Sequence, residues 1–237
     1  MTSNPDIRSW LIVFIFAVLI SMSFRFFVIK IIEQTVNIRK SIIPIFSWIN
    51  KKAPVKVVNI VFDLIFTVLV IIIYLHSQNL WISGLKIVLI AGLLSLALID
   101  WYMYRLPNIF IITSLIVIIS IILVNSDFNM SYIYGALTGM AGGLVIRVFG
   151  KMYYKREVFG LGDIKLLLLM GLITGMNYFF PIFLVGMLIA SIYSIIAVLT
   201  GYLQWMSKIP LGSFLCIAII IYLIIDPSYL DLLYNII

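Results

Sequence analysis

The 237 residues carry a formal net charge of +7, yet only 11% of them are charged and 64% are hydrophobic, with a mean hydropathy of +1.23. A soluble domain has about 25% charged residues, so the composition excludes a soluble globular protein and indicates a polytopic membrane protein. Cys216 and His76 are the single cysteine and the single histidine. This excludes a disulfide framework, a cysteine zinc cluster and a two-histidine metalloprotease motif.

Eight apolar stretches are long enough, at about 20 residues each, to cross a bilayer as helices. They lie at 10–32, 57–75, 82–102, 107–125, 131–150, 161–178, 180–203 and 209–226. We therefore expect an all-α fold in which residues 1–237 form a single membrane domain. The sixth and seventh spans are separated by a very short gap.

Glycines recur every four residues in two of these spans. They lie at 135, 139 and 143 in the fifth span, and at 171 and 175 in the sixth. Small residues at this spacing let helix backbones approach closely in lipid, so ordinary tight packing explains them.

Lysine and arginine are distributed unevenly between the connecting segments. The segment 33–56 holds five of them and the segment 147–165 holds another five, whereas the loops at 76–83 and 125–131 hold none. The positive-inside rule then places the basic loops in the cytoplasm and both termini outside a multi-pass plasma-membrane protein. Basic residues beside membrane spans suit anionic lipid, so we expect no direct binding of nucleic acid.

Three aspartates belong to the predicted spans or their ends. Asp63 lies two turns into the second span, where a carboxylate is costly, and is either a site residue or a buried hydrogen-bonded group. Asp100 ends the third span in "LALIDWYMYRLPN", and Asp163 begins the sixth in "FGLGDIKLLLL". The topology places Asp100 and Asp163 at the same cytoplasmic boundary, where they can meet.

A pair of close carboxylates resists losing both protons and therefore shares one. The ionised member can activate a water molecule while the protonated member polarises a carbonyl group, as in aspartic proteases. Gly160 and Gly162 allow the tight backbone that close approach of a substrate needs. The alternative interpretation is that Asp163 only caps its helix beside Lys165, and that Asp100 is a boundary residue near Arg105.

Three segments resemble those of one protein family. "FGLGDIK" resembles the GxGD motif of membrane aspartyl proteases, and "ALIDWYMYRLPN" resembles the first catalytic segment of type IV prepilin peptidases. "KIPLGSFL" resembles the late "IPFGPF" segment of these peptidases, and the order and spacing of all three segments agree. Nearer the N-terminus, Asp63 falls where that family has a glutamate. The resemblance is most specific over 95–175, the GxGD protease core.

The resemblance implies a helical bundle that removes the basic leader peptide from prepilin or pseudopilin precursors, with Asp100 and Asp163 as the catalytic pair at the cytoplasmic face. It implies an aspartic endopeptidase that uses neither a metal nor a cofactor. The positions that match its motif or substrate-binding residues are Gly160, Gly162, Lys165, Arg105, Pro107, Asn108 and Asp63.

The chain differs from the bifunctional members of this family in two segments. The basic loop at 33–56 has no cysteines, so we expect no zinc there, and in this respect it resembles the competence-type peptidases of Gram-positive bacteria. The segment "ISMSFRFFVIKI" lacks the glycine, asparagine and proline of the segment that the family associates with methylation. The sequence therefore gives little support to N-methyltransferase activity.

Two alternatives remain at the level of sequence. Presenilin-like proteases share GxGD but pair it with "YD" and "PAL", and this chain has "ID" and no "PAL". A proton-coupled transporter could instead use Asp63, Asp100 and Asp163 as a relay, although the chain shows no obvious inverted repeat.

Overall fold

The computed structural model describes positions 15, 19, 23 and 26 and the ranges 28–31, 55–76, 80–125, 129–155, 159–201, 203–204 and 207–225. The first predicted span and the basic loop at 33–56 lie largely outside these residues. The described helices are α3 (Val55–His76), α4 (Leu80–Met103), α5 (Asn108–Asn125), α6 (Met130–Tyr154), α7 (Leu161–Leu199) and α8 (Leu211–Ile224). The described ranges contain no strand, in agreement with the predicted all-α class.

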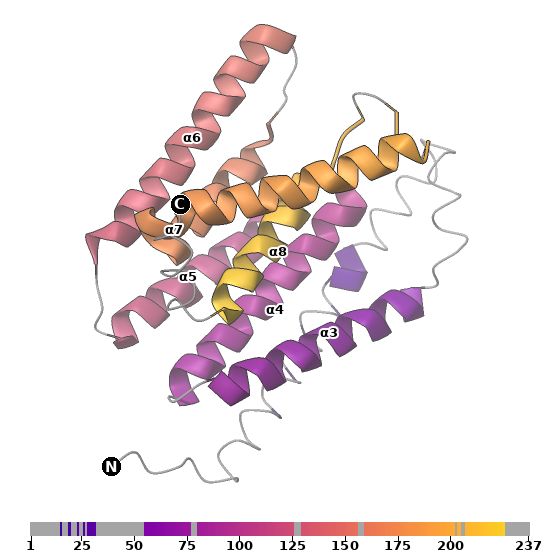
Figure 1. The fold of residues 1–237 in the computed structure, drawn as a ribbon. Coiled ribbons are helices and arrows are strands. Elements are labelled where there is room, and N and C mark those ends of the chain that lie inside the picture. The colour runs from indigo at the N-terminus through magenta and orange to yellow at the C-terminus, as the bar shows by residue number, and fades with distance from the viewer. Residues whose placement is uncertain are drawn as a thin grey trace. The chain divides into compact units, whose positions relative to one another are not determined.

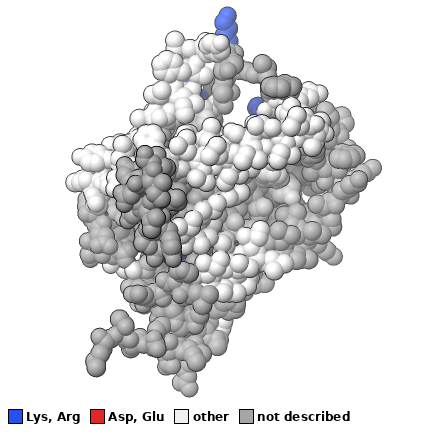
Figure 2. Space-filling model, in the orientation of Figure 1, with Lys and Arg blue, Asp and Glu red and all other residues white. Residues whose placement is uncertain are grey.

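Several of these helices have the length and composition of membrane spans. In the part of the chain that the structure describes, three helical stretches are long and apolar enough to cross a bilayer: Trp81–Met103, Met130–Tyr153 and Leu161–Leu199. Shorter apolar stretches lie at Phe62–Ile73, Asn108–Val124 and Leu211–Ile224. The face drawn in Figure 2 shows no aspartate or glutamate and only a few lysine or arginine atoms on its described surface. A helical membrane protein is thus confirmed, while the number of eight spans stays a prediction.

The chain divides into two compact units, Met1–Ala91 and Gly92–Ile237. The first unit contains α3, on which Phe62 and Phe66 stack with their ring centroids 6.4 Å apart. The second unit contains the C-terminal part of α4 together with α5, α6, α7 and α8 (Figure 1). Both Asp100 and Asp163 belong to this second unit.

Within the second unit, α7 packs against α5, α6 and α8. Its contact with α6 is made by glycines. A Cβ atom added to Gly135 would collide with the main chain of Gly171, and one added to Gly139 would collide with the main chain of Leu167. The predicted close helix packing is therefore present, and it fixes the first half of α7 against α6.

The sixth and seventh predicted spans are joined in α7, whose backbone is interrupted at Gly175. A straight helix of 39 residues would be about 58 Å long, roughly twice the hydrocarbon thickness of a bilayer. Gly175 has φ 67° and ψ 177°, a conformation that favours glycine. Just after the break, the Met176 N–H donates to Ser131 Oγ at 3.0 Å. The two segments therefore separate at Gly175, the first residue of the stretch "GMNYFFP" that joins the two predicted spans.

Candidate active site

Asp100 lies in the last turn of α4 and is only 4% exposed. Its Oδ2 accepts a hydrogen bond from the Ser213 N–H at 2.9 Å, and Ser213 Oγ lies 3.4 Å from the same oxygen. Ser213 Oγ also donates to the Ala97 carbonyl at 2.7 Å. The first turn of α8 is thereby joined to the end of α4, between residues that are 113 positions apart in the chain.

Asp163 lies in the first turn of α7. Its Oδ2 accepts a hydrogen bond from the Gly160 N–H at 3.2 Å, which is the reach of a third-position side chain back to the N-cap. Asp163 therefore does cap its helix, as the alternative interpretation supposed. Capping engages one of its oxygens and is compatible with a further chemical role.

The two carboxylates are close enough for their charges to act on each other, and both act on the buried Cys216 of α8. Each also lies at the N-terminal end of a helix: Asp163 on α7 itself, and Asp100 against the first turn of α8. Helix N-termini carry free N–H groups and a partial positive charge that stabilise an anion. This arrangement suits a carboxylate pair that holds one negative charge and one shared proton.

Glycines leave the space that the carboxylates occupy. A Cβ atom on Gly212 would lie 2.9 Å from Asp100 Oδ2, and one on Gly160 would lie 3.0 Å from Asp163 Oδ2. A Cβ atom on Gly162 would lie 3.1 Å from Leu106 Cβ. A Cβ atom on Gly212 would lie 3.1 Å from Leu106 Cδ1. Leu106 thus lies between the GxGD turn and the start of α8, so any side chain at these glycines would displace the site.

The remaining predicted site residues lie at the surface, in the turn before α5, or on α3. Lys165 Nζ donates to Asn108 Oδ1 at 2.8 Å, which joins the first turns of α7 and α5 at the surface. Arg105 is exposed in the turn between α4 and α5, and Pro107 is half-buried directly before α5. Asp63 lies on α3 in the first unit, so its participation stays a prediction.

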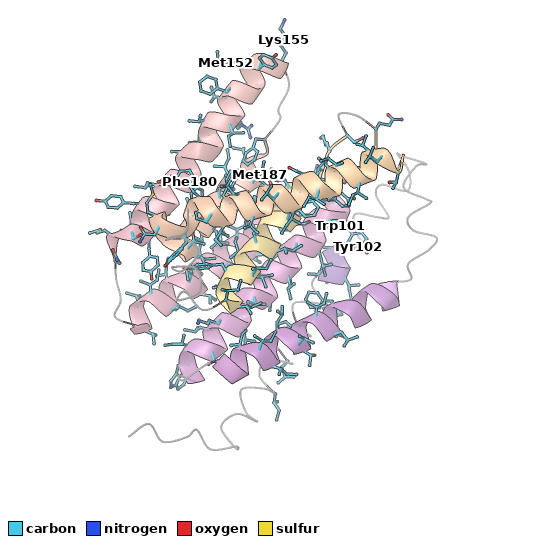
Figure 3. The ribbon with its side chains drawn as sticks, in the orientation of Figure 1. Trp101, Tyr102, Met152, Lys155, Phe180 and Met187 are labelled. Carbon is cyan, nitrogen blue, oxygen red and sulfur yellow. The ribbon has the colours of Figure 1, made fainter. Side chains whose placement is uncertain are left out.

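Two further contacts hold the elements of the site. Trp101, next to Asp100 and labelled in Figure 3, packs against Tyr193 of α7 and Phe214 of α8, with ring centroids 5.2 and 5.9 Å away. Arg147 of α6 donates from Nη1 to the Phe159 carbonyl at 3.2 Å. The first contact fixes α4 against α8, and the second fixes the segment that enters the GxGD turn.

Sequence reasoning missed Leu106, Gly212 and Ser213 as residues of the site. All of them lie in segments that carry the family resemblance, "RLPN" and "KIPLGSFL". That resemblance was a usable signal, but it gave no indication that the late segment contacts Asp100.

One family model matches the part of the chain that contains this site. Residues 87–195 match the model of the type IV leader peptidase family. The match covers a little under half of the 237 residues and shows that this part of the chain is similar to that family. The match confirms the predicted family, and it includes both aspartates and the GxGD turn. Asp63, Gly212 and Ser213 lie outside the matched residues. The searches of curated proteins and of solved structures found no match.

A type IV leader peptidase is a protease, so the family supports the coarse function predicted from sequence. Among the described residues, no group of three or more histidine, cysteine, aspartate or glutamate side chains is placed to bind an ion.

Proposed function

We propose that this protein is a membrane aspartyl endopeptidase that removes the basic leader peptide from type IV prepilin-like or competence pseudopilin precursors at the cytoplasmic membrane face. The observation that carries the proposal is the meeting of Asp100 and Asp163 between the N-terminal turns of α8 and α7. Two carboxylates in electrostatic contact supply the acid and the base that hydrolysis of a peptide bond needs.

The reaction needs only a water molecule and the two carboxyl groups. The ionised carboxylate takes a proton from water while the water oxygen forms a bond to the substrate carbonyl carbon. The protonated carboxyl then gives its proton to the leaving nitrogen, and the C–N bond breaks. Because the pair titrates as a unit, either aspartate can begin the cycle as the base.

The position of the site at a membrane boundary supports a substrate with two parts. Asp100 ends one apolar helix and Asp163 begins another. In such a precursor the basic leader stays in the cytoplasm and the hydrophobic segment enters the bilayer. The peptide bond that joins the two parts would then lie at the membrane boundary, beside the two aspartates. The basic residues of 147–165 support the cytoplasmic assignment.

The test is co-expression with a pilin-like precursor from the same genome, followed by mass measurement of that precursor. We expect wild type to shorten the precursor by its leader, and Asp100→Ala or Asp163→Ala to lower the cleavage rate by about a thousandfold or more. Asp100→Asn and Asp163→Asn keep the side-chain size and control for packing.

Membrane insertion and yield of each variant are measured in the same cells. Cleavage at the wild-type rate by either alanine variant would remove the pair from the mechanism. If wild type leaves several pilin-like precursors uncut, the peptidase proposal fails, and proton-coupled flux in proteoliposomes becomes the next measurement. The mature mass also shows whether a methyl group is added.

A further inference from the structure

We propose that Ser213 is a positioning residue of the carboxylate pair, which orients Asp100 through its main-chain N–H and adjusts to the protonation of Asp100 through its hydroxyl. This inference rests on the proposed function, because it assigns Asp100 a chemical role. It adds to the site a residue of α8 that lies outside the family match.

The main-chain contribution follows from the start of α8. The first N–H groups of a helix have no partner within the helix. The Ser213 N–H makes a 3.2 Å bond to the Pro210 carbonyl and a shorter, 2.9 Å bond to Asp100 Oδ2. The Ser213 N–H thus holds Oδ2 of Asp100 at the start of α8, and the Gly212 N–H adds a second main-chain contact to the same carboxylate.

The Ser213 hydroxyl has a single hydrogen to donate and two oxygen atoms close enough to receive it. Ser213 Oγ lies 2.7 Å from the Ala97 carbonyl and 3.4 Å from Asp100 Oδ2. When Asp100 is ionised, the hydroxyl can rotate and donate to it. When Oδ2 carries a proton, the hydroxyl can accept that proton's hydrogen bond and donate to Ala97. It therefore suits both states that the reaction requires.

Among the residues that the structure describes, two ionisable groups interact with this carboxylate. Asp163 approaches it from α7 and Cys216 from α8. Neither of these two groups is cationic, so neither can take over the role of the Ser213 donors when they are removed.

Two substitutions separate the two contributions. Ser213→Ala removes only the hydroxyl, whereas Ser213→Pro also removes the N–H and is tolerated in the first turn of a helix. Ser120→Ala is the matched control, because Ser120 Oγ likewise donates to a main-chain carbonyl, that of Ile116 at 2.9 Å, but on α5. Each full-length variant is purified in detergent and assayed on a purified pilin-like precursor over a pH series from about 4 to 9, which gives the pH dependence of kcat and of kcat/KM.

We expect kcat to fall about threefold to tenfold in Ser213→Ala and about tenfold to a hundredfold in Ser213→Pro, from the usual contributions of hydrogen bonds to a carboxylate. KM should change little. The pH–activity profile should move to higher pH by roughly half a unit to one unit, because an ionised carboxylate that loses a donor needs a higher pH to form. Ser120→Ala should match wild type in kcat, in KM and in its pH–activity profile.

Wild-type kcat and an unchanged pH profile in either Ser213 variant would overturn the proposal. So would a fall in kcat that follows a loss of thermal stability while the pH profile stays fixed, because that pattern indicates a purely structural serine. These results differ from failure of the proposed function, in which wild type itself cleaves no precursor.

Discussion

Glycine serves two purposes in two regions of this protein. Between α6 and α7, Gly135 and Gly171 bring two backbones into contact, and the space they leave is filled by main chain. At the ends of α4, α7 and α8, Gly160 and Gly212 leave space that carboxylate oxygens fill. The same residue type is therefore needed for stability in the first region and for chemistry in the second. Substitution should separate them, because one region determines whether the protein folds and the other whether it reacts.

The largest effect is expected for Gly171→Ala. Its Cβ atom would collide with the Gly135 carbonyl, and helix backbones cannot yield as a flexible side chain can. We expect a loss of about 1–3 kcal/mol in stability, seen as lower yield and a lower unfolding temperature in detergent.

Gly142→Ala is the matched control for this change, since a Cβ atom on Gly142 meets nothing within 4 Å. Alanine there should be neutral or slightly stabilising because it is a better helix former. Equal stability of the Gly171→Ala and Gly142→Ala variants would contradict the close contact between α6 and α7.

A smaller effect on folding and a clear effect on activity are expected for Gly212→Ala. The added Cβ atom would lie 2.9 Å from Asp100 Oδ2, so the carboxylate must move. Displacement of a reacting group by about 1 Å can lower the rate a hundredfold, and we expect kcat to fall about tenfold to a hundredfold with a nearly unchanged unfolding temperature.

The comparison between the two regions depends on this second variant. If Gly212→Ala lost as much stability as Gly171→Ala, the glycines of both regions would serve packing alone. If it retained full activity, Asp100 would not need the space that Gly212 leaves.

The smallest effect is expected at the surface, where Lys165 donates to Asn108. An exposed hydrogen bond of this kind contributes little, so Asn108→Ala and Lys165→Met should each lower kcat by only about twofold to fivefold. Steady-state kinetics on the same precursor measure this.

The two variants also test whether the lysine contacts substrate. Asn108→Ala keeps the positive charge, and Lys165→Met removes it. Equal effects are expected if the pair only joins α5 to α7. A rise in KM confined to Lys165→Met would show instead that the charge binds the precursor, and would place the substrate beside the GxGD turn.

The sequence alone determined that the protein is helical and lies in a membrane, because apolar composition and the length of the spans are local properties. It also selected Asp100 and Asp163, since a carboxylate in an otherwise apolar chain is rare enough to be weighed individually. The four-residue spacing of glycines likewise predicted the close packing of α6 and α7. All of these signals can be read within a short window of the chain.

The tertiary structure decided what no such window contains. Ser213 and Asp100 are 113 positions apart, so their hydrogen bond depends on how α8 packs against α4. Leu106 belongs to the site only because two separate glycine turns close around it. The break in α7 falls at Gly175 because that glycine adopts a positive φ while Ser131 of another helix accepts the Met176 N–H. Each of these features depends on residues brought together by folding, which is why the apolar pattern of the sequence did not reveal them.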